Sequence, residues 1–106
     1  MRSTLIPWAV LASLAMVSAA HAEIRLKPIA CPMGGDAGFR IIGAHGEDDG
    51  VDAEYQWLAA ERPGWTRANQ STIQNGGRIF DVLDIEKGAQ KQSICFDITD
   101  FFGKMQ

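Results

Sequence analysis

The sequence predicts an α+β domain: one helix packed on a small antiparallel sheet of three to four strands, linked by one disulfide. Three observations predict it: one helical apolar stripe, three strand-like runs separated by glycine turns, and two distant cysteines. The chain has 106 residues, of which 46% are hydrophobic and 22% charged, as in ordinary globular domains. This length excludes multi-domain enzymes and nucleotide-binding α/β folds.

The first 22 residues are typical of an export signal. A basic start precedes an apolar stretch over residues 5–17, and the small residues Ala20 and Ala22 suit a signal peptidase. We therefore predict a signal peptide over 1–22, cleaved before Glu23. No cysteine follows that position directly, so we expect a periplasmic or secreted bacterial protein that is neither a lipoprotein nor membrane-spanning after cleavage.

The two cysteines, Cys31 and Cys95, both lie in the exported part and are 64 positions apart. An even pair in an oxidising compartment predicts one disulfide. A redox-active pair usually has its thiols close in sequence, as in C-x-x-C. We therefore expect a structural disulfide that links the beginning of the domain to its last strand.

The first half of the exported chain is predicted as an extended arm, a strand and a helix. Proline and glycine punctuate the arm over 23–38, and a strand is expected over 39–45. The helix is expected over 51–62, with Asp49 as its N-cap and Pro63 beyond its end. The helical stripe that should face the core consists of Val51, Tyr55, Leu58 and Ala59.

The second half is predicted as a strand meander within a single α+β domain over 39–106. Strands are expected over 65–74, 78–86 and 91–98, with a hairpin turn at Asn75-Gly76-Gly77. The middle strand carries apolar residues on both faces. A sheet with one solvent-exposed face would alternate more regularly between apolar and polar residues. We therefore expect the helix to cover one face and the arm, linked through Cys31 to Cys95, to cover part of the other.

The charge of the exported part disfavours nucleic acid as a partner. Removal of residues 1–22 leaves nine basic and thirteen acidic side chains, a formal charge of −4. A protein that binds a phosphate backbone needs a basic patch, which this sequence lacks.

The polar residues offer weak candidates for metal binding or catalysis. The densest polar group consists of His45, Glu47, Asp48, Asp49 and Asp52, but these residues lack the spacing of a calcium loop. Acidic residues before a helix more often favour the helix dipole. On neighbouring strands, Asp81, Asp84 and Asp97 fit an acid–base pair or solvated positions equally well. We predict no catalytic residue, no metal ligand and no cofactor.

Aromatic and arginine residues near the end of the predicted helix form the candidate binding surface. Trp57 falls on a flank of the helical stripe, and Trp65 follows the turn that ends the helix. Together with Arg62 and Arg67, these residues are of the kinds that dominate protein interfaces. The acidic loop would form an electrostatic rim. Alternatively, the tryptophans simply cover the edge of a small core.

The stretch over 54–104 resembles small exported bacterial proteins of uncharacterised function that share a helix followed by a three-stranded meander. The resemblance is carried by Glu54-Tyr55-x-Trp57-Leu58, Pro63-Gly64, Phe80-Asp81-Val82-Leu83 and the FDITDFFGK ending. It implies the fold and the compartment, and no activity.

From the sequence we expect a small exported non-enzymatic binding protein of the bacterial envelope, an inhibitor or immunity-type partner of another envelope or secreted protein. Two alternatives stay open. One is a metal-dependent or hydrolytic enzyme that uses His45 and the acidic loop, and the other is a structural envelope component that pairs through a strand edge.

Overall fold

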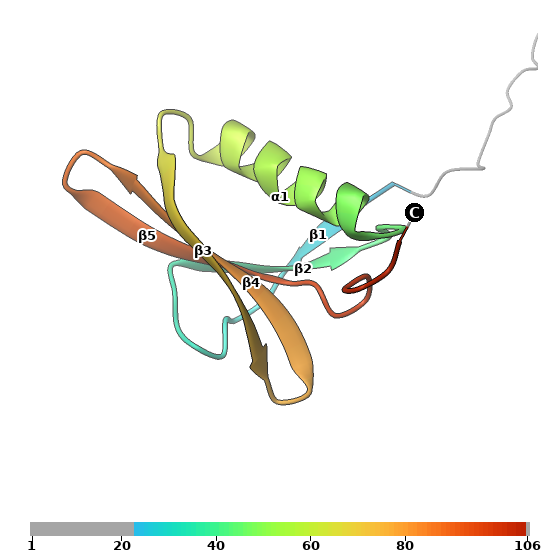
Figure 1. Ribbon diagram of the computed structural model, residues 1–106. Coiled ribbons are helices and arrows are strands. Elements are labelled where there is room, and N and C mark those ends of the chain that lie inside the picture. The colour runs from blue at the N-terminus through green and yellow to red at the C-terminus, as the bar shows by residue number, and fades with distance from the viewer. Residues whose placement is uncertain (1–22, 106) are drawn as a thin grey trace, which may run out of the picture.

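A computed structural model describes residues 23–105, so the expected signal peptide lies outside the described residues. One helix and five strands follow one another in the order β1, β2, α1, β3, β4, β5 (Figure 1). Their bounds are β1 Arg25–Pro28, β2 Ala37–Ile42, α1 Glu47–Glu61, β3 Thr66–Asn75, β4 Arg78–Lys87 and β5 Gln90–Asp97. The α+β class is confirmed.

The strands form one mixed sheet in the order β1-β2-β5-β4-β3, so the expected three to four antiparallel strands are corrected to five. The neighbours β2 and β5 run parallel, whereas the other pairs are antiparallel. The connection through α1 brings the chain back so that β3 runs in the direction of β2, and the two hairpin turns then reverse it twice, so β5 is also parallel to β2. The additional strand β1 lies in the segment predicted as an extended arm. It was not predicted because three of its four residues, Arg25, Lys27 and Pro28, are of types that are uncommon in strands.

The hairpin turns agree with the sequence prediction. Between β3 and β4, Gly76 and Gly77 have φ angles of 58° and 78°. Two consecutive residues at positive φ define the tight turn whose twist matches that of a hairpin, and glycine adopts them without steric cost.

The helix begins four residues earlier than predicted. Gly46 is the N-cap residue, and the acidic residues expected in a loop form the first turn of α1. Asp49 is therefore not the N-cap: it lies inside the helix, and its carboxylate accepts a hydrogen bond of 3.2 Å from the backbone N–H of His45. Three carboxylates at a helix N-terminus favour the helix dipole.

The face of α1 that meets the sheet also differs from the predicted stripe. Ala59 is exposed, whereas Gly50 and Glu54 are buried. The residues that face the sheet follow the spacing i, i+3, i+4, i+7, i+8 and are Gly50, Ala53, Glu54, Trp57 and Leu58. The sequence prediction used apolar residues only, so it did not identify this face, in which two of the five positions are glycine and glutamate.

The hydrophobic core lies between α1 and the sheet, and α1 crosses one face (Figure 1). The core is completed by the turn after β5, because Phe101 is buried against Gly50. The buried core residues are Ile41, Leu83, Ile85, Ile94, Phe96, Ile98 and Phe101.

The disulfide between Cys31 and Cys95 is present, as predicted. It joins the β1–β2 loop to β5 on the face that α1 leaves open (Figure 1). At Gly38 a Cβ atom would lie 3.2 Å from the sulfur of Cys95 and 2.9 Å from the carbonyl oxygen of Ile29. Glycine at this position therefore lets the loop and the disulfide lie close to β2.

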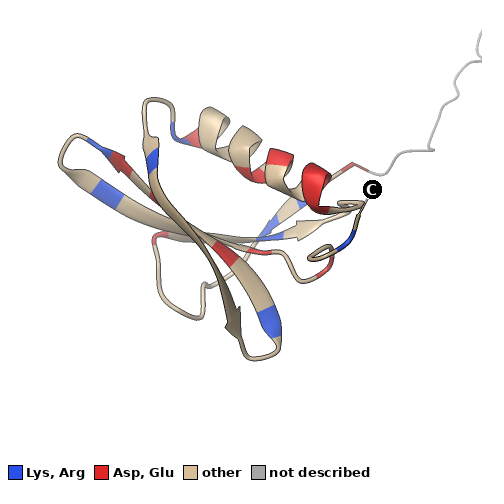
Figure 2. Cartoon of the chain, viewed as in Figure 1, with Lys and Arg blue, Asp and Glu red and all other residues tan. Residues whose placement is uncertain are grey.

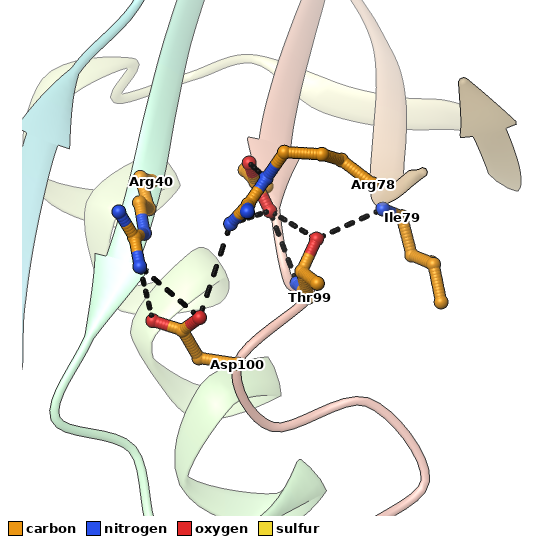
Figure 3. Close-up of polar contacts among 6 residues, drawn as sticks. Arg40, Arg78, Ile79, Thr99 and Asp100 are labelled. Carbon is orange, nitrogen blue, oxygen red and sulfur yellow. Dashed lines mark hydrogen bonds and ion pairs between the residues drawn. The ribbon is translucent and has the colours of Figure 1, made fainter. Parts of the chain in front are cut away.

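A polar network fixes the end of β5 to β4. The Asp97 carboxylate accepts a hydrogen bond of 2.6 Å from Nε of Arg78 and further bonds from the hydroxyl and backbone N–H of Thr99. Burial alone would raise the pKa of Asp97, but the bonds from Arg78 and Thr99 outweigh it and lower the pKa below the usual aspartate value. Thr99 in turn accepts a bond of 2.9 Å from the N–H of Ile79 (Figure 3).

The same network holds the turn that carries Phe101. Arg40 of β2 forms an ion pair of 3.0 Å with Asp100, and Arg78 lies 3.8 Å from the same carboxylate (Figure 3). Because Asp100 directly precedes Phe101, these two cations help to place the phenyl ring under the first turns of α1.

Within the described residues, α1 is too short and too polar to cross a membrane.

Candidate functional site

The four residues predicted to form an interface lie around the second half of α1 and the start of β3. We call this region, with Tyr55 added, the arginine–aromatic corner: Tyr55, Trp57, Arg62, Trp65 and Arg67. Its positions follow from the helix end, since the chain leaves α1 at Glu61 and enters β3 at Thr66.

Trp57 is half-buried and belongs to an aromatic cluster with the sheet. Its ring centroid lies 5.1 Å from that of Phe39 on β2 and 5.9 Å from that of Phe96 on β5. The contact with Phe96 is edge-to-face, a favourable arrangement for aromatic rings. One side of the indole therefore supports the core.

The guanidinium group of Arg62 lies on the ring of Trp57, 4.9 Å from its centroid. Its Nε donates a hydrogen bond of 2.8 Å to the side-chain oxygen of Gln92 on β5, and Nη1 donates to the carbonyl oxygen of Glu61. A guanidinium above an indole is a favourable cation–π arrangement. Arg62 is thus held in one place by an aromatic ring and two hydrogen bonds.

On the β3 side of α1, Arg67 repeats this arrangement with Tyr55. Its guanidinium lies 4.4 Å from the Tyr55 ring centroid, and Nη1 donates to the Tyr55 hydroxyl at 2.8 Å and to the side-chain oxygen of Gln70 at 3.1 Å. Tyr55 belongs to the stripe predicted to face the core, but in the structure its ring lies against the guanidinium of Arg67.

Trp65 lies between the two arginines along the chain. It is half-buried against the core, and its backbone N–H donates to the carbonyl oxygen of Arg62 at 3.2 Å. The structure therefore pairs Arg62 with Trp57 and Arg67 with Tyr55, and leaves Trp65 in the turn that joins them.

Neither arginine of the corner forms an ion pair with a carboxylate in the described part of the chain. Arg40 and Arg78, by contrast, are both neutralised by aspartates. Glu47, Asp48 and Asp49 form the first turn of α1, which is red in Figure 2, whereas at the other end of the helix the acidic Glu61 directly precedes Arg62 and red lies beside blue. The corner thus contributes two cationic groups, with the carboxylate of Glu61 next to it in the chain, to a protein of formal charge −3.

Beneath α1, the structure brings together a carboxyl pair that the sequence analysis missed. Glu54 has no exposed surface and Asp81 of β4 is 5% exposed. Thr72 of β3 donates a hydrogen bond of 2.9 Å to Asp81. Among the described residues, no donor bonds either carboxyl oxygen of Glu54. The signal in the sequence was the position of Glu54, one turn after Gly50 and one turn before Leu58.

The pKa of Glu54 is raised to about 10. Loss of water around the buried carboxyl is the largest cause, followed by the hydrogen bond to Asp81 and the charge of Asp81, while Arg67 acts weakly in the opposite direction. At neutral pH Glu54 is therefore protonated. That proton lets two neighbouring carboxyl groups, which would otherwise both be acceptors, share a hydrogen bond.

The residues of the alternative enzyme hypothesis are divided among different contacts. His45 Nδ1 lies 2.9 Å from a carboxylate oxygen of Asp49. Asp49 also lines a surface pocket of about 340 Å³ together with Asp52, Ile24 and Leu26, whereas Asp48 lines another pocket with Gly103 and Lys104. Within residues 23–105, no three His, Cys, Asp or Glu side chains are grouped to hold a metal ion.

The three aspartates considered for acid–base chemistry are engaged separately. Asp84 accepts a hydrogen bond of 2.6 Å from the Ser93 hydroxyl, on the face that α1 does not cover. Asp97 binds Arg78, and Asp81 pairs with Glu54. An acid–base pair among the strand aspartates therefore has no geometric support.

No protein-family model, curated protein or solved structure matches this chain.

Proposed function

We propose that the protein is a small exported binding module that docks on another envelope or secreted protein through the arginine–aromatic corner. In this proposal it acts without catalysis, as an inhibitor or immunity-type partner. The observation that carries the proposal is the pair of guanidinium groups that lie on aromatic rings and, within residues 23–105, form no ion pair with a carboxylate.

Fixed side chains favour docking because binding then costs less conformational entropy. A rotamer-rich side chain that becomes immobile at an interface costs about 0.5–1.5 kcal/mol. The hydrogen bonds of Arg62 and Arg67 to Gln92, Tyr55 and Gln70 have already removed part of that freedom. The guanidinium groups keep a positive charge that suits carboxylates, so the expected partner presents an acidic protein surface.

Charge reversal at the corner tests this function. We expect the double variant Arg62→Glu/Arg67→Glu to bind its partner at least about tenfold more weakly, because two favourable charge contacts become repulsive. The wild type is used to capture partners from envelope extract of its own organism, and the affinity of each purified partner is then measured by calorimetry.

The control is Arg25→Glu/Lys27→Glu on β1, which changes the same charge at two exposed residues away from the corner. This control should bind as the wild type does. Equal affinity of the corner variant and the control for every captured partner would contradict the docking surface, as would failure to capture any protein.

One further observation favours the second candidate, a structural envelope component that pairs through a strand edge. The edge strands of the sheet are β1 and β3, and they differ in the features that oppose pairing with another chain. The short β1 edge carries Arg25, Lys27 and Pro28, which oppose edge pairing, whereas the ten residues of β3 include one charge and no proline. The pairing of β3 with β4 is irregular between Arg67 and Asn69, near the start of the strand, and regular from Asn69 to Asn75.

Under this second candidate, the protein would self-associate through β3. Ser71→Lys/Gln74→Lys should then weaken association at least about tenfold, since like charges would meet across paired strands. Sedimentation at increasing concentration measures it, with Ala89→Lys/Gln90→Lys at the β4–β5 turn as the control. A wild type that is monomeric at all concentrations excludes this candidate.

A further inference from the structure

The pair formed by Glu54 and Asp81 is unusual because both carboxyl groups are removed from water at the centre of the helix–sheet contact. Glu54 lies on the face of α1 that meets the sheet, and Asp81 lies on β4 opposite Thr72 of β3. Among the described residues, Thr72 donates to Asp81, while Glu54 receives no hydrogen bond from any donor. Two ionised carboxylates placed this way would repel each other in a medium of low polarity.

We propose that Glu54 and Asp81 share a single proton and that this proton is needed for α1 to pack on the sheet, so that the fold loosens as the solution becomes alkaline. The proton bridges the two carboxyl groups in the folded protein. When α1 separates from the sheet, Glu54 meets water, ionises and releases the proton to the solvent.

The charged groups around Glu54 do not replace the proton that Glu54 and Asp81 share. The neighbouring strands contribute two charged groups, Asp81 of β4 and Arg67 of β3, and Asp81 has the stronger effect on Glu54. The guanidinium of Arg67 lies on the Tyr55 ring and bonds its hydroxyl. On α1 itself, the residues three and four positions away from Glu54 are uncharged: Gly50, Val51, Trp57 and Leu58.

The direction of the pH effect follows from proton binding. The pKa of Glu54 is about 10 in the folded protein, against an ordinary value of 4.5. Between these values the folded state holds a proton that the unfolded chain has lost, so stability falls as pH rises. Asp97 acts in the opposite sense, because its pKa is lowered and its contribution is lost only in acid, below the usual aspartate range.

The experiment compares the pH dependence of unfolding in the wild type and in Glu54→Gln, with the disulfide intact. From about pH 5 to pH 9, the unfolding equilibrium constant of the wild type should rise by up to about tenfold per pH unit more than that of the variant. Glutamine removes the titration but can still donate to Asp81. Glu61→Gln, an exposed glutamate on the same helix, should keep the wild-type pH dependence.

Two measurements on the wild type alone guard against a variant that does not fold. By carbon NMR, the side-chain carboxyl of Glu54 should remain protonated through neutral pH. Hydrogen exchange, corrected for its intrinsic pH dependence, should become faster in α1 as pH rises. A Glu54 carboxyl that titrates near pH 4.5, or parallel stability profiles of the wild type and Glu54→Gln, would overturn the proposal.

Discussion

Replacement of Gly50 by alanine is expected to destabilise the protein by about 2–3 kcal/mol, although alanine is the better helix former by about 1 kcal/mol. A Cβ atom at this position would overlap the ring of Phe101, with Cε2 at 2.6 Å and two further ring atoms closer still. The ring is 1% exposed and is held by the turn after β5, so it has little room to move. Urea denaturation measures the effect.

A double-mutant cycle tests whether overlap with the Phe101 ring is the reason that Gly50→Ala destabilises the protein. Phe101→Ala alone should cost about 3–5 kcal/mol, as expected for a buried aromatic ring. In that background the overlap is gone, so Gly50→Ala should become neutral or stabilising by up to about 1 kcal/mol. A destabilisation of the same size in both backgrounds would show that the ring is not the reason.

Removal of the disulfide by Cys31→Ser/Cys95→Ser is expected to lower the free energy of unfolding by roughly 4 kcal/mol. The bond closes a loop with a sequence separation of 64, and a cross-link of that length strongly restricts the unfolded chain. A domain of this size has a net stability of about 5–15 kcal/mol, so the variant should unfold at much lower denaturant concentration.

Removal of the disulfide should increase local opening of the β1–β2 loop, because the loop forms few other bonds to the sheet. Without the disulfide, the loop would still be held by Asp36, which bonds the backbone of Ser93 in both directions at 2.8 Å each, and by the N–H of Ile29, which donates to the carbonyl oxygen of Gly38 at 3.0 Å. Hydrogen exchange in residues 29–36 should therefore accelerate before that in α1. Reductant added to the wild type should reproduce the variant, and identical denaturation midpoints with and without reductant would refute the prediction.

The fold elements near the glycine turns could be predicted because local chemistry decides them. Gly76 and Gly77 adopt positive φ, and the long strands β4 and β5 lie within about one residue of their expected bounds. Strand β1 could not be predicted in the same way, since four residues with two charges and a proline carry no strand pattern. It exists because β2 offers an edge to which it pairs.

The candidate site was predicted in composition but not in arrangement. Trp57, Arg62, Trp65 and Arg67 all lie near the end of α1, as their positions required. That Arg67 lies on Tyr55 rather than beside Trp65 depends on β3, which returns along α1 only in the folded sheet. Periodicity alone does not reveal such partners.

The sequence by itself determined the α+β class, the helix-then-meander order and the pairing of the two cysteines, because each follows from short-range patterns or from having two thiols. Only the tertiary structure decided which face of α1 is buried, that β5 runs beside β2, and that Glu54 meets Asp81. The physical reason is that burial depends on what the opposite surface supplies: Phe101 fills the space left by Gly50, and Asp81 accepts a hydrogen bond from the protonated carboxyl of a glutamate that looks solvent-exposed in the sequence.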